Sequence, residues 1–361
     1  MNFYSFLRSL TLLACLTGFS GYVFADDLSS VRQSSSGDQD QFLPVCVSFY
    51  NVENLFDTID DPDRNDKEFT PGGSNKWNAE KYEEKMENLA KVISRIGASV
   101  TPDGPAVLGV SEIENETVLQ DLANEEKIKD RNYQHVYHRG RDRRVDNALL
   151  YNPKYFQLTA SASVSTKIED FHGFRTRDHL VVSGLLLGEP FHFIVAHWPS
   201  RRGGEKESRP NRIAAAKSAR SIIDSLKNIN EDARIVFMGD LNDDPDDVSV
   251  SDYLNTAGNK TDLKYDQLYN PFYKMAEKGQ GTLAYRDAWN LFDQIIISQS
   301  LLRNDSSDFK YHSASIYKEP YMLQSSGRFQ GYPFRSYGGG VYLGGYSDHF
   351  PSYIILIRKI K

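Results

Sequence analysis

Short apolar runs alternate with polar stretches along most of the chain. Apolar residues spaced three and four apart predict helices over residues 78–96, 117–124 and 211–226. Compact apolar runs bounded by polar or turn-forming residues predict strands over residues 44–50, 106–110, 147–151, 180–187, 191–196, 234–238, 294–298 and 352–357. The strands outnumber the helices and are not evenly interleaved with them. This pattern favours an α/β sandwich over a doubly wound sheet.

The first 25 residues have the pattern of an export signal. Arg8 supplies a positive charge, Leu10–Leu16 form a short apolar segment, and Val23–Ala25 end on a small residue. Glycine, serine and threonine interrupt the apolar stretch, so it does not predict a transmembrane segment. We therefore expect an exported, periplasmic or extracellular protein. An alternative is cleavage before Cys15, which would leave a protein lipid-anchored at that residue.

The remaining chain divides into a linker and one domain. Residues 26–41 are rich in serine, glutamine and aspartate, which predicts a flexible linker, and residues 42–361 contain no second segment of this kind. Two segments read as loops: residues 57–76, and the glycine- and tyrosine-rich residues 328–346. Within the domain the lone Cys46 lies in an apolar run, so we expect a buried thiol and no disulfide framework.

The net charge of −7 limits how the chain could bind nucleic acid. With 40% hydrophobic and 25% charged residues, the composition is typical of a soluble globular protein. An acidic chain has no general electrostatic attraction for a polyanion. A nuclease of this composition needs a local basic patch or a bound cation.

Side chains capable of metal binding or acid/base chemistry cluster at the ends of predicted strands. Four predicted strands are followed by such residues: Asn51 and Glu53, Glu112, His197, and Asp240 with Asn242. Two later strands are preceded by them: Asp293, and Asp348 with His349. If the two late strands run antiparallel to the others, all of these groups meet at one edge of the sheets. Loops held at such an edge commonly carry catalytic residues.

Hydrolysis of a phosphate ester requires a hard cation, a base for water, and hydrogen-bond donors for the phosphate oxygens. Mg²⁺ prefers oxygen ligands and retains several waters. One or two carboxylates and an amide suit it, and we expect Asn51, Glu112 and Asp348 to be the metal ligands.

The remaining residues suit the proton transfers and the phosphate contacts. A histidine oriented by a carboxylate is a general base, and His349 with Asp293 is the candidate pair. Asp240 would position or help deprotonate the attacking water. His197 and Asn242 would donate hydrogen bonds to phosphate oxygens.

Several arginines are candidate phosphate contacts. Arg201 and Arg202 are predicted substrate-binding residues, because the guanidinium fork matches phosphate geometry. Residues 139–144, with Arg175 and Arg177, are a further basic group near the predicted site. A run of charges is equally typical of a solvated surface, so both interpretations stand for this group.

Each site residue taken alone has a structural explanation. Asp240 and Asn242 could form a turn stabilised by an aspartate side chain, His197 could be a core histidine, and Asp293 could cap a strand. The hypothesis of a catalytic site depends on all the residues occurring together and in order.

Six short motifs in that order resemble the endonuclease/exonuclease/phosphatase superfamily, the DNase I-like proteins. They are Phe49–Asn54, Gly109–Glu112, Ala196–Trp198, Gly239–Asp243, Phe292–Gln294 and Ser347–His349. The resemblance extends from Pro44 to the C-terminus. It implies a four-layer sandwich of two central mixed β-sheets flanked by helices, with Mg²⁺ or Mn²⁺ as cofactor. It also implies the site roles given above, and a substrate-binding role for Asn147 in a strand before the substrate-facing loop.

The expected function is therefore metal-dependent hydrolysis of phosphoesters. A secreted nuclease acting on nucleic acid is the first hypothesis, with no protein partner and a monomeric state. The glycine- and tyrosine-rich insert before Ser347 departs from compact nucleases, which keeps a second hypothesis open: a phosphatase or phospholipase-type diesterase acting on inositol phosphates or lipid headgroups. A hypothesis of another class is a catalytically inactive binding protein on the same fold.

Overall fold

The computed structural model describes residues 6–7, 41–140, 144–166, 176–303 and 309–360. The predicted export signal, the Cys15 anchor and the linker lie outside the described residues, apart from Phe6, Leu7 and Gln41, and so does the candidate Arg175. No helix in the described part of the chain has both the length and the apolar character needed to span a bilayer.

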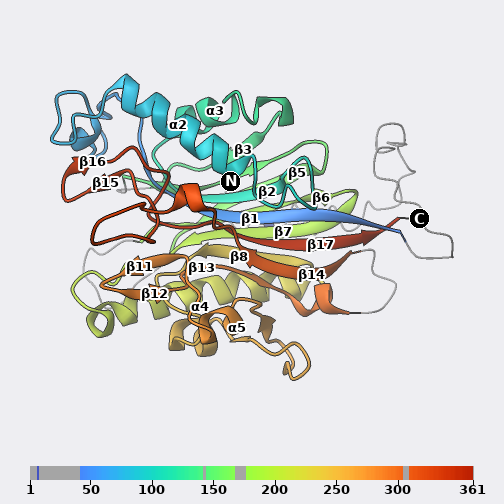
Figure 1. Cartoon of the computed structure of the whole chain (residues 1–361). Helices are drawn as coiled ribbons and strands as arrows, with labels where there is room; N and C mark the ends of the chain where they lie inside the picture. Colours follow the sequence, from blue (N-terminus) through green and yellow to red (C-terminus); the bar gives the residue numbers. More distant parts are fainter. Residues whose placement is uncertain (1–5, 8–40, 141–143, 167–175, 304–308, 361) are drawn as a thin grey trace.

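Two large mixed sheets form the centre of the molecule (Figure 1). The first has the order β14 (Phe309–Ile316), β17 (Ser352–Lys359), β1 (Phe42–Leu55), β2 (Pro105–Ile113), β4 (Asp146–Tyr151), β3 (Gln134–Tyr137). The second has the order β5 (Phe156–Val164), β6 (His179–Leu186), β7 (Glu189–His197), β8 (Ile235–Asp240), β13 (Asp293–Ile297), β10 (Leu268–Tyr269), β9 (Thr256–Ala257).

Helices and small hairpins complete the fold. The α-helices are α2 (Ala79–Ile93), α3 (Glu116–Ala123), α4 (Glu205–Ile229) and α5 (Tyr273–Glu277). The hairpins are β11 (Leu283–Tyr285) with β12 (Ala288–Asn290), and β15 (Tyr337–Gly338) with β16 (Val341–Tyr342). Short 3-10 helices span Lys67–Phe69, Lys129–Arg131, Gln299–Leu302 and Pro320–Met322, and one π-helical turn spans Ser249–Tyr253.

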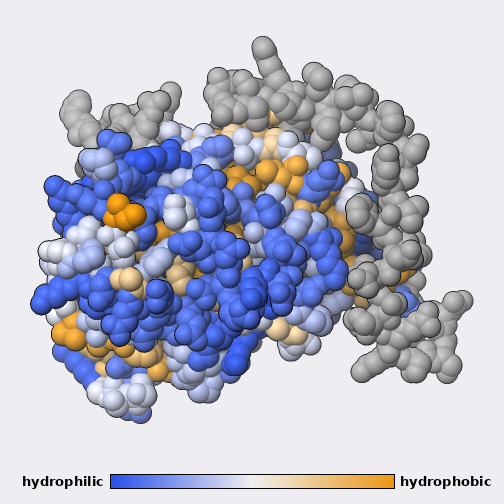
Figure 2. Space-filling model, turned by 90° about the horizontal axis from the view of Figure 1, so that it is seen from above, coloured by the Kyte–Doolittle hydropathy of each residue, from blue (hydrophilic) through white to orange (hydrophobic). Residues whose placement is uncertain are grey.

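The alternation of side chains along the strands builds the layers. In β1, Val47 and Phe49 point into the core between the two sheets, whereas Cys46 and Tyr50 pack on the other face, in the core that includes α2 and α3. A third core lies between the second sheet and α4. The result is the expected four-layer sandwich, with α2 and α3 above and α4 below the sheets (Figure 1). The face seen from the α2 and α3 side is largely hydrophilic (Figure 2).

Helix boundaries agree with the predictions at some ends and differ at others. The Asn78 side chain accepts a hydrogen bond from the Lys81 backbone N–H and caps α2, as expected. Helix α4 begins at Glu205, six residues before the predicted start at Asn211. The predicted start is too late because proline is usually found at the start of a helix, whereas Pro210 lies inside α4.

Strand direction determines where the polar strand ends meet. Strand β17 pairs antiparallel with β1, and β13 pairs antiparallel with β8. The starts of these two late strands therefore lie beside the ends of β1 and β8. This is the arrangement on which the predicted convergence of site residues depended.

Among the described strands of four or more residues, three were not predicted from the sequence: β3, β5 and β14. Each lies at the edge of a sheet, and β14 and β5 have many half-buried or exposed residues. An edge strand packs on fewer neighbours, so its sequence lacks the continuous apolar run that identified the central strands.

Candidate active site

The candidate site lies at the end of the sandwich where both sheets contribute residues. The first sheet supplies Asn51 from β1, Glu112 from β2, and Asp348 with His349 from the turn before β17. The second supplies His197, Asp240 and Asp293 from the ends of β7, β8 and β13. The register places Asp240 opposite both His197 and Asp293. The backbone therefore brings the predicted residues together.

The closest pair in the site joins a histidine to a carboxylate. His349 Nδ1 lies 2.7 Å from Asp293 Oδ2, and both side chains are buried. Burial alone lowers the pKa of His349, but the carboxylates of Asp293 and Asp240 outweigh it and raise this pKa well above its ordinary value. Asp293 thus fixes the orientation of the imidazole ring, as expected for the predicted pair.

Asp240 lies at the centre of the polar cluster. Its Oδ2 accepts a hydrogen bond from Asn51 Nδ2 at 3.0 Å and lies 3.4 Å from His197 Nε2 and 3.9 Å from His349 Nε2. Its Oδ1 accepts the backbone N–H of Asn242 at 3.0 Å, so the aspartate-stabilised turn is present as well. Burial raises the pKa of Asp240 to about 7, against the opposing effect of His349.

Backbone strain accompanies Glu112. The ladders of β2 shift register around this residue, and its φ is +69°, in the left-handed region that side chains other than glycine and asparagine rarely adopt. The bulge allows the carboxylate to accept hydrogen bonds from Asn54 N at 2.7 Å and Asn51 Nδ2 at 3.3 Å. Strain of this kind is typical of functional positions.

Ser347 links the turn before β17 to β1. It lies in one of the six sequence motifs, but the sequence predicted no role for it. Ser347 Oγ donates to the carbonyl oxygen of Asn51 at 2.7 Å and accepts the His349 backbone N–H at 3.1 Å. Asp348 Oδ1 lies 3.9 Å from His349 Nε2, and Asp348 Oδ2 lies 3.7 Å from an Arg335 guanidinium nitrogen. Arg335 was not predicted, because it lies in the irregular insert, where sequence periodicity gives no position.

The donor set suits a hard divalent cation. Ligand atoms of Asp240, Asp293 and His349 lie within 4.8 Å of one another, and Asp293 Oδ1 is buried without a hydrogen-bond partner in the described structure. With the carboxylate of Glu112 and the amide of Asn51, the set offers mainly oxygen ligands, which Mg²⁺ and Mn²⁺ prefer. A cation here would relieve the repulsion between buried carboxylates.

The predicted phosphate-binding arginines are placed differently from one another. Arg201 makes ion pairs with Asp243 at 3.1 Å and Asp247 at 2.6 Å, and Nε donates to the Asn242 carbonyl oxygen at 2.9 Å. Its guanidinium therefore braces the loop after β8. Arg202 is exposed.

The described basic residues of the second group, Arg139, Arg144 and Arg177, also differ in their surroundings. Arg139 and Arg144 pair with Asp61 and Glu68 at the surface. Arg177 is half-buried, and its Nε has no hydrogen-bond partner among the described residues. Asn147 is buried on β4, where Nδ2 donates to the Asp178 carbonyl oxygen at 2.9 Å and Oδ1 has no hydrogen-bond partner among the described residues. Arg177 and Asn147 thus have buried polar atoms without a hydrogen-bond partner in the described part of the chain, whereas Arg139 and Arg144 are ion-paired.

Comparisons with known proteins identify the family and the fold. Residues 46–358 match the model of the Endonuclease/Exonuclease/phosphatase family. No curated protein matches the sequence.

Solved structures share the fold at low identity. A crystal structure of D. rerio TDP2 complexed with single strand DNA product has a TM-score of 0.52 and 13% identity, covering 87% of this chain and 98% of that chain. A family protein from Bacteroides thetaiotaomicron has a TM-score of 0.51 and 14% identity, covering 89% and 98%. The human Nocturnin catalytic domain with bound sulfate anion has a TM-score of 0.50 and 15% identity, covering 88% and 96%. The family match over most of the chain and the shared fold lead to one assignment: this protein belongs to the endonuclease/exonuclease/phosphatase family.

Proposed function

We propose that this protein is a divalent-metal-dependent phosphodiesterase that hydrolyses nucleic acid. The family assignment carries the coarser statement, a phosphoesterase. The observation that supports a catalytic role for this chain is the buried His349–Asp293 pair beside Asp240, at the meeting point of both sheets. A catalytically inactive binding protein would have no need for these buried charges, which are costly to maintain.

In the proposed site, Glu112, Asn51 and Asp348 would hold Mg²⁺ or Mn²⁺. When bound, the cation neutralises charge on the phosphate oxygens and favours attack by water. Two of the expected ligands contact each other beside Asp240, since Asn51 Nδ2 donates to both Glu112 and Asp240. Burial raises the pKa of Asp240 even though the charge of His349 lowers it.

The protein's own side chains divide the remaining tasks. Asp293 orients His349, so Nε2 is the ring nitrogen that exchanges a proton with the reacting groups. Asp240 Oδ2 holds the attacking water, because it faces both histidines. His197, and Asn242 at the turn after β8, donate to non-bridging phosphate oxygens.

Nucleic acid is the favoured substrate for two reasons. One structural neighbour carries a single strand DNA product, although at 13% identity that likeness shows the fold alone. The second reason lies in this chain: arginines lie beside the site in a molecule of net charge −7. A nuclease that is acidic as a whole needs such a local positive region to bind its polyanionic substrate.

The second candidate is a diesterase or phosphatase for lipid headgroups or inositol phosphates. Exposed aromatic side chains near the site, Tyr285 and Phe329, favour it. A panel of single- and double-stranded DNA, RNA, nucleotides, sphingomyelin and phosphoinositides with Mg²⁺ separates the candidates. Turnover of nucleic acid at least tenfold above the lipids supports the proposal, and preferential turnover of a lipid or inositol phosphate contradicts it.

A further inference from the structure

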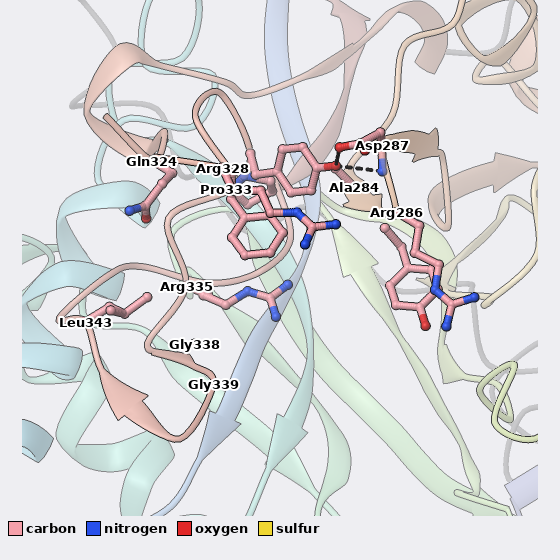
Figure 3. Close-up of a pocket in the computed structure, with 13 residues that line it drawn as sticks. Ala284, Arg286, Asp287, Gln324, Arg328, Pro333, Arg335, Gly338, Gly339 and Leu343 are labelled. Atoms are coloured by element: carbon pink, nitrogen blue, oxygen red, sulfur yellow. Dashed lines mark hydrogen bonds between the residues drawn. The ribbon is translucent and has the colours of Figure 1, made fainter. Parts of the chain in front are cut away.

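A separate pocket opens next to the candidate active site. It has a volume of about 330 Å³ and lies between the β11–β12 hairpin and the segment from Gln324 to Leu343 (Figure 3). Its walls include Tyr285, Arg286, Arg328, Phe329, Tyr332 and Arg335. None of these residues had a role in the expectations drawn from the sequence.

Arg335 connects the pocket to the reacting centre. It lines the pocket, and its guanidinium lies 3.7 Å from Asp348 Oδ2. Asp348 precedes His349 and is an expected metal ligand. A group bound in the pocket is therefore a neighbour of the phosphate being cleaved.

The charge of the pocket is opposite to that of the whole chain. Three arginines and one aspartate line it, so its formal charge is +3 − 1 = +2, whereas the chain carries −7. Within the described residues, neither Arg286 nor Arg328 has a carboxylate within salt-bridge distance. Both guanidinium groups are available to an anion.

The hairpin turn that carries Arg286 is held in a costly conformation. Arg286 and Asp287 both have positive φ, +49° and +66°, and they form the two-residue loop between β11 and β12. Such turns favour asparagine and glycine, and non-glycine residues in this region cost of order 1 kcal/mol or more each. The Tyr332 hydroxyl stabilises the turn by accepting the Asp287 backbone N–H at 2.7 Å and donating to Asp287 Oδ1 at 2.5 Å (Figure 3). Contact between the two segments thus fixes the position of Arg286.

Flat aromatic surfaces accompany these charges. Tyr285 is 62% exposed and Phe329 is 53% exposed, unusual values for large aromatic side chains. Arg286 lies over the Tyr285 ring at 5.2 Å, and Arg328 lies over the Phe329 ring at 5.6 Å. Aromatic rings stack on nucleobases, and arginine forks bind phosphate. A lipid could also contact exposed rings and charges, but a nucleotide offers a planar base to stack on a ring together with a phosphate for an arginine.

We propose that this pocket is a nucleotide subsite: it binds one base and the two backbone phosphates that adjoin it, on a single strand whose next phosphate occupies the active site. This inference rests on the proposed nuclease function and adds the residues that recognise the strand. Arg286 and Arg328 bind the backbone phosphates, and Tyr285 and Phe329 stack on the base.

Binding of a fluorescent hexathymidylate in EDTA, followed by anisotropy at several salt concentrations, tests the proposal. For the double variant Arg286→Ala/Arg328→Ala we expect the dissociation constant to rise about tenfold or more. The slope of log affinity against log salt should fall by about 1.4, because each lost phosphate contact on a single strand contributes about 0.7. Phe329→Leu should weaken binding severalfold without changing this slope. Arg303→Ala, an exposed arginine paired with Asp232 beyond the far end of β13, is the matched control.

Three outcomes decide the matter. The subsite is supported if the double variant binds the oligonucleotide more weakly and with a smaller salt slope, while Arg303→Ala binds like wild type. Unchanged oligonucleotide binding in a double variant that no longer binds phosphatidylserine vesicles overturns it in favour of a lipid surface. Unchanged binding to both probes also overturns it. Hydrolysis of the oligonucleotide by the wild-type protein in Mg²⁺ is measured separately: if it proceeds while the variants bind normally, the subsite is wrong and the nuclease function stands.

Discussion

At the scale of single residues, the proposed mechanism depends on carboxylates that act through other groups. Asp293 contacts His349 at 2.7 Å and is fully buried, so its role is to orient and charge the imidazole ring. A carboxylate in this position fixes which ring nitrogen faces the substrate.

Asp293→Asn keeps the shape of the side chain and removes its charge. We expect the kcat for a phosphodiester to fall by roughly 10²- to 10⁴-fold, the usual contribution of acid/base groups, with a KM within a fewfold of wild type. Steady-state hydrolysis measures both constants. Asp232→Asn, at an exposed aspartate, is the control and should be unaffected. A kcat within threefold of wild type for Asp293→Asn would remove the pair from the mechanism.

A second residue-scale prediction concerns acid stability. Burial lowers the pKa of His179 in the folded state to about 4, whereas an unfolded histidine titrates near 6.5. The unfolded chain therefore binds the proton first, so stability is complete above about pH 6.5 and is lost as the pH falls towards 4. His179 should account for about 1–2 kcal/mol of this loss at pH 5.

Urea unfolding at pH 7.5 and pH 5 measures the effect. In His179→Gln the loss of stability between the two pH values should be smaller than in wild type. His312→Gln, at an exposed histidine on β14, should retain the wild-type loss. An unchanged pH dependence in His179→Gln would show that this histidine is charged in the folded protein or exposed to solvent.

At the scale of elements, helix α2 supports the insert that borders the site. Lys85 is buried on α2, donates to Ser336 Oγ at 2.6 Å and to the Tyr346 carbonyl oxygen at 2.8 Å, and lies 3.8 Å from Glu53. Tyr337 and Tyr342 also pack around Trp77 in this region. These two tyrosines of the insert therefore serve its packing against the rest of the domain.

Lys85→Ala should leave Glu53 buried without its cation. Breaking one partner of a buried pair costs about 3–5 kcal/mol. Lys127→Ala removes an exposed pair with Glu87 and should cost less than about 1 kcal/mol. Equilibrium urea denaturation compares the two variants, and equal costs would contradict the structural role given to Lys85.

The sequence predicted the central strands better than the edges. Strands β1, β7 and β8 are buried on both faces, and that burial left continuous apolar runs. Edge strands such as β5 and β14 have mixed patterns that resemble loops.

The site shows the same contrast. Residues next to central strands, such as Asp240 and His349, were found because the strand ends located them. Arg335 and the strained turn at Arg286 were not found, because their positions depend on contacts between an irregular insert and a distant hairpin. Such contacts leave no periodic signal.

At the scale of the whole molecule, the two sheets act as a rigid frame that brings distant segments to one edge. Antiparallel pairing of β17 with β1 and of β13 with β8 determines that the early and late motifs meet. The hairpins β11–β12 and β15–β16 lie at this same end, opposite the C-terminus (Figure 1). The candidate active site and the proposed nucleotide subsite therefore share one end of the sandwich.

We propose that the side chains brought together at the ends of the two sheets hydrolyse a phosphodiester with the help of a bound divalent cation. The most direct measurement is the hydrolysis rate of bis(p-nitrophenyl) phosphate with Mg²⁺, with EDTA, and after Mg²⁺ is restored, in wild type, His349→Ala and the exposed-site control His312→Ala. We expect activity that EDTA abolishes and Mg²⁺ restores in wild type and in the control, and at least a hundredfold loss in His349→Ala. Activity that persists in EDTA, or a His349→Ala variant as active as wild type, would contradict it.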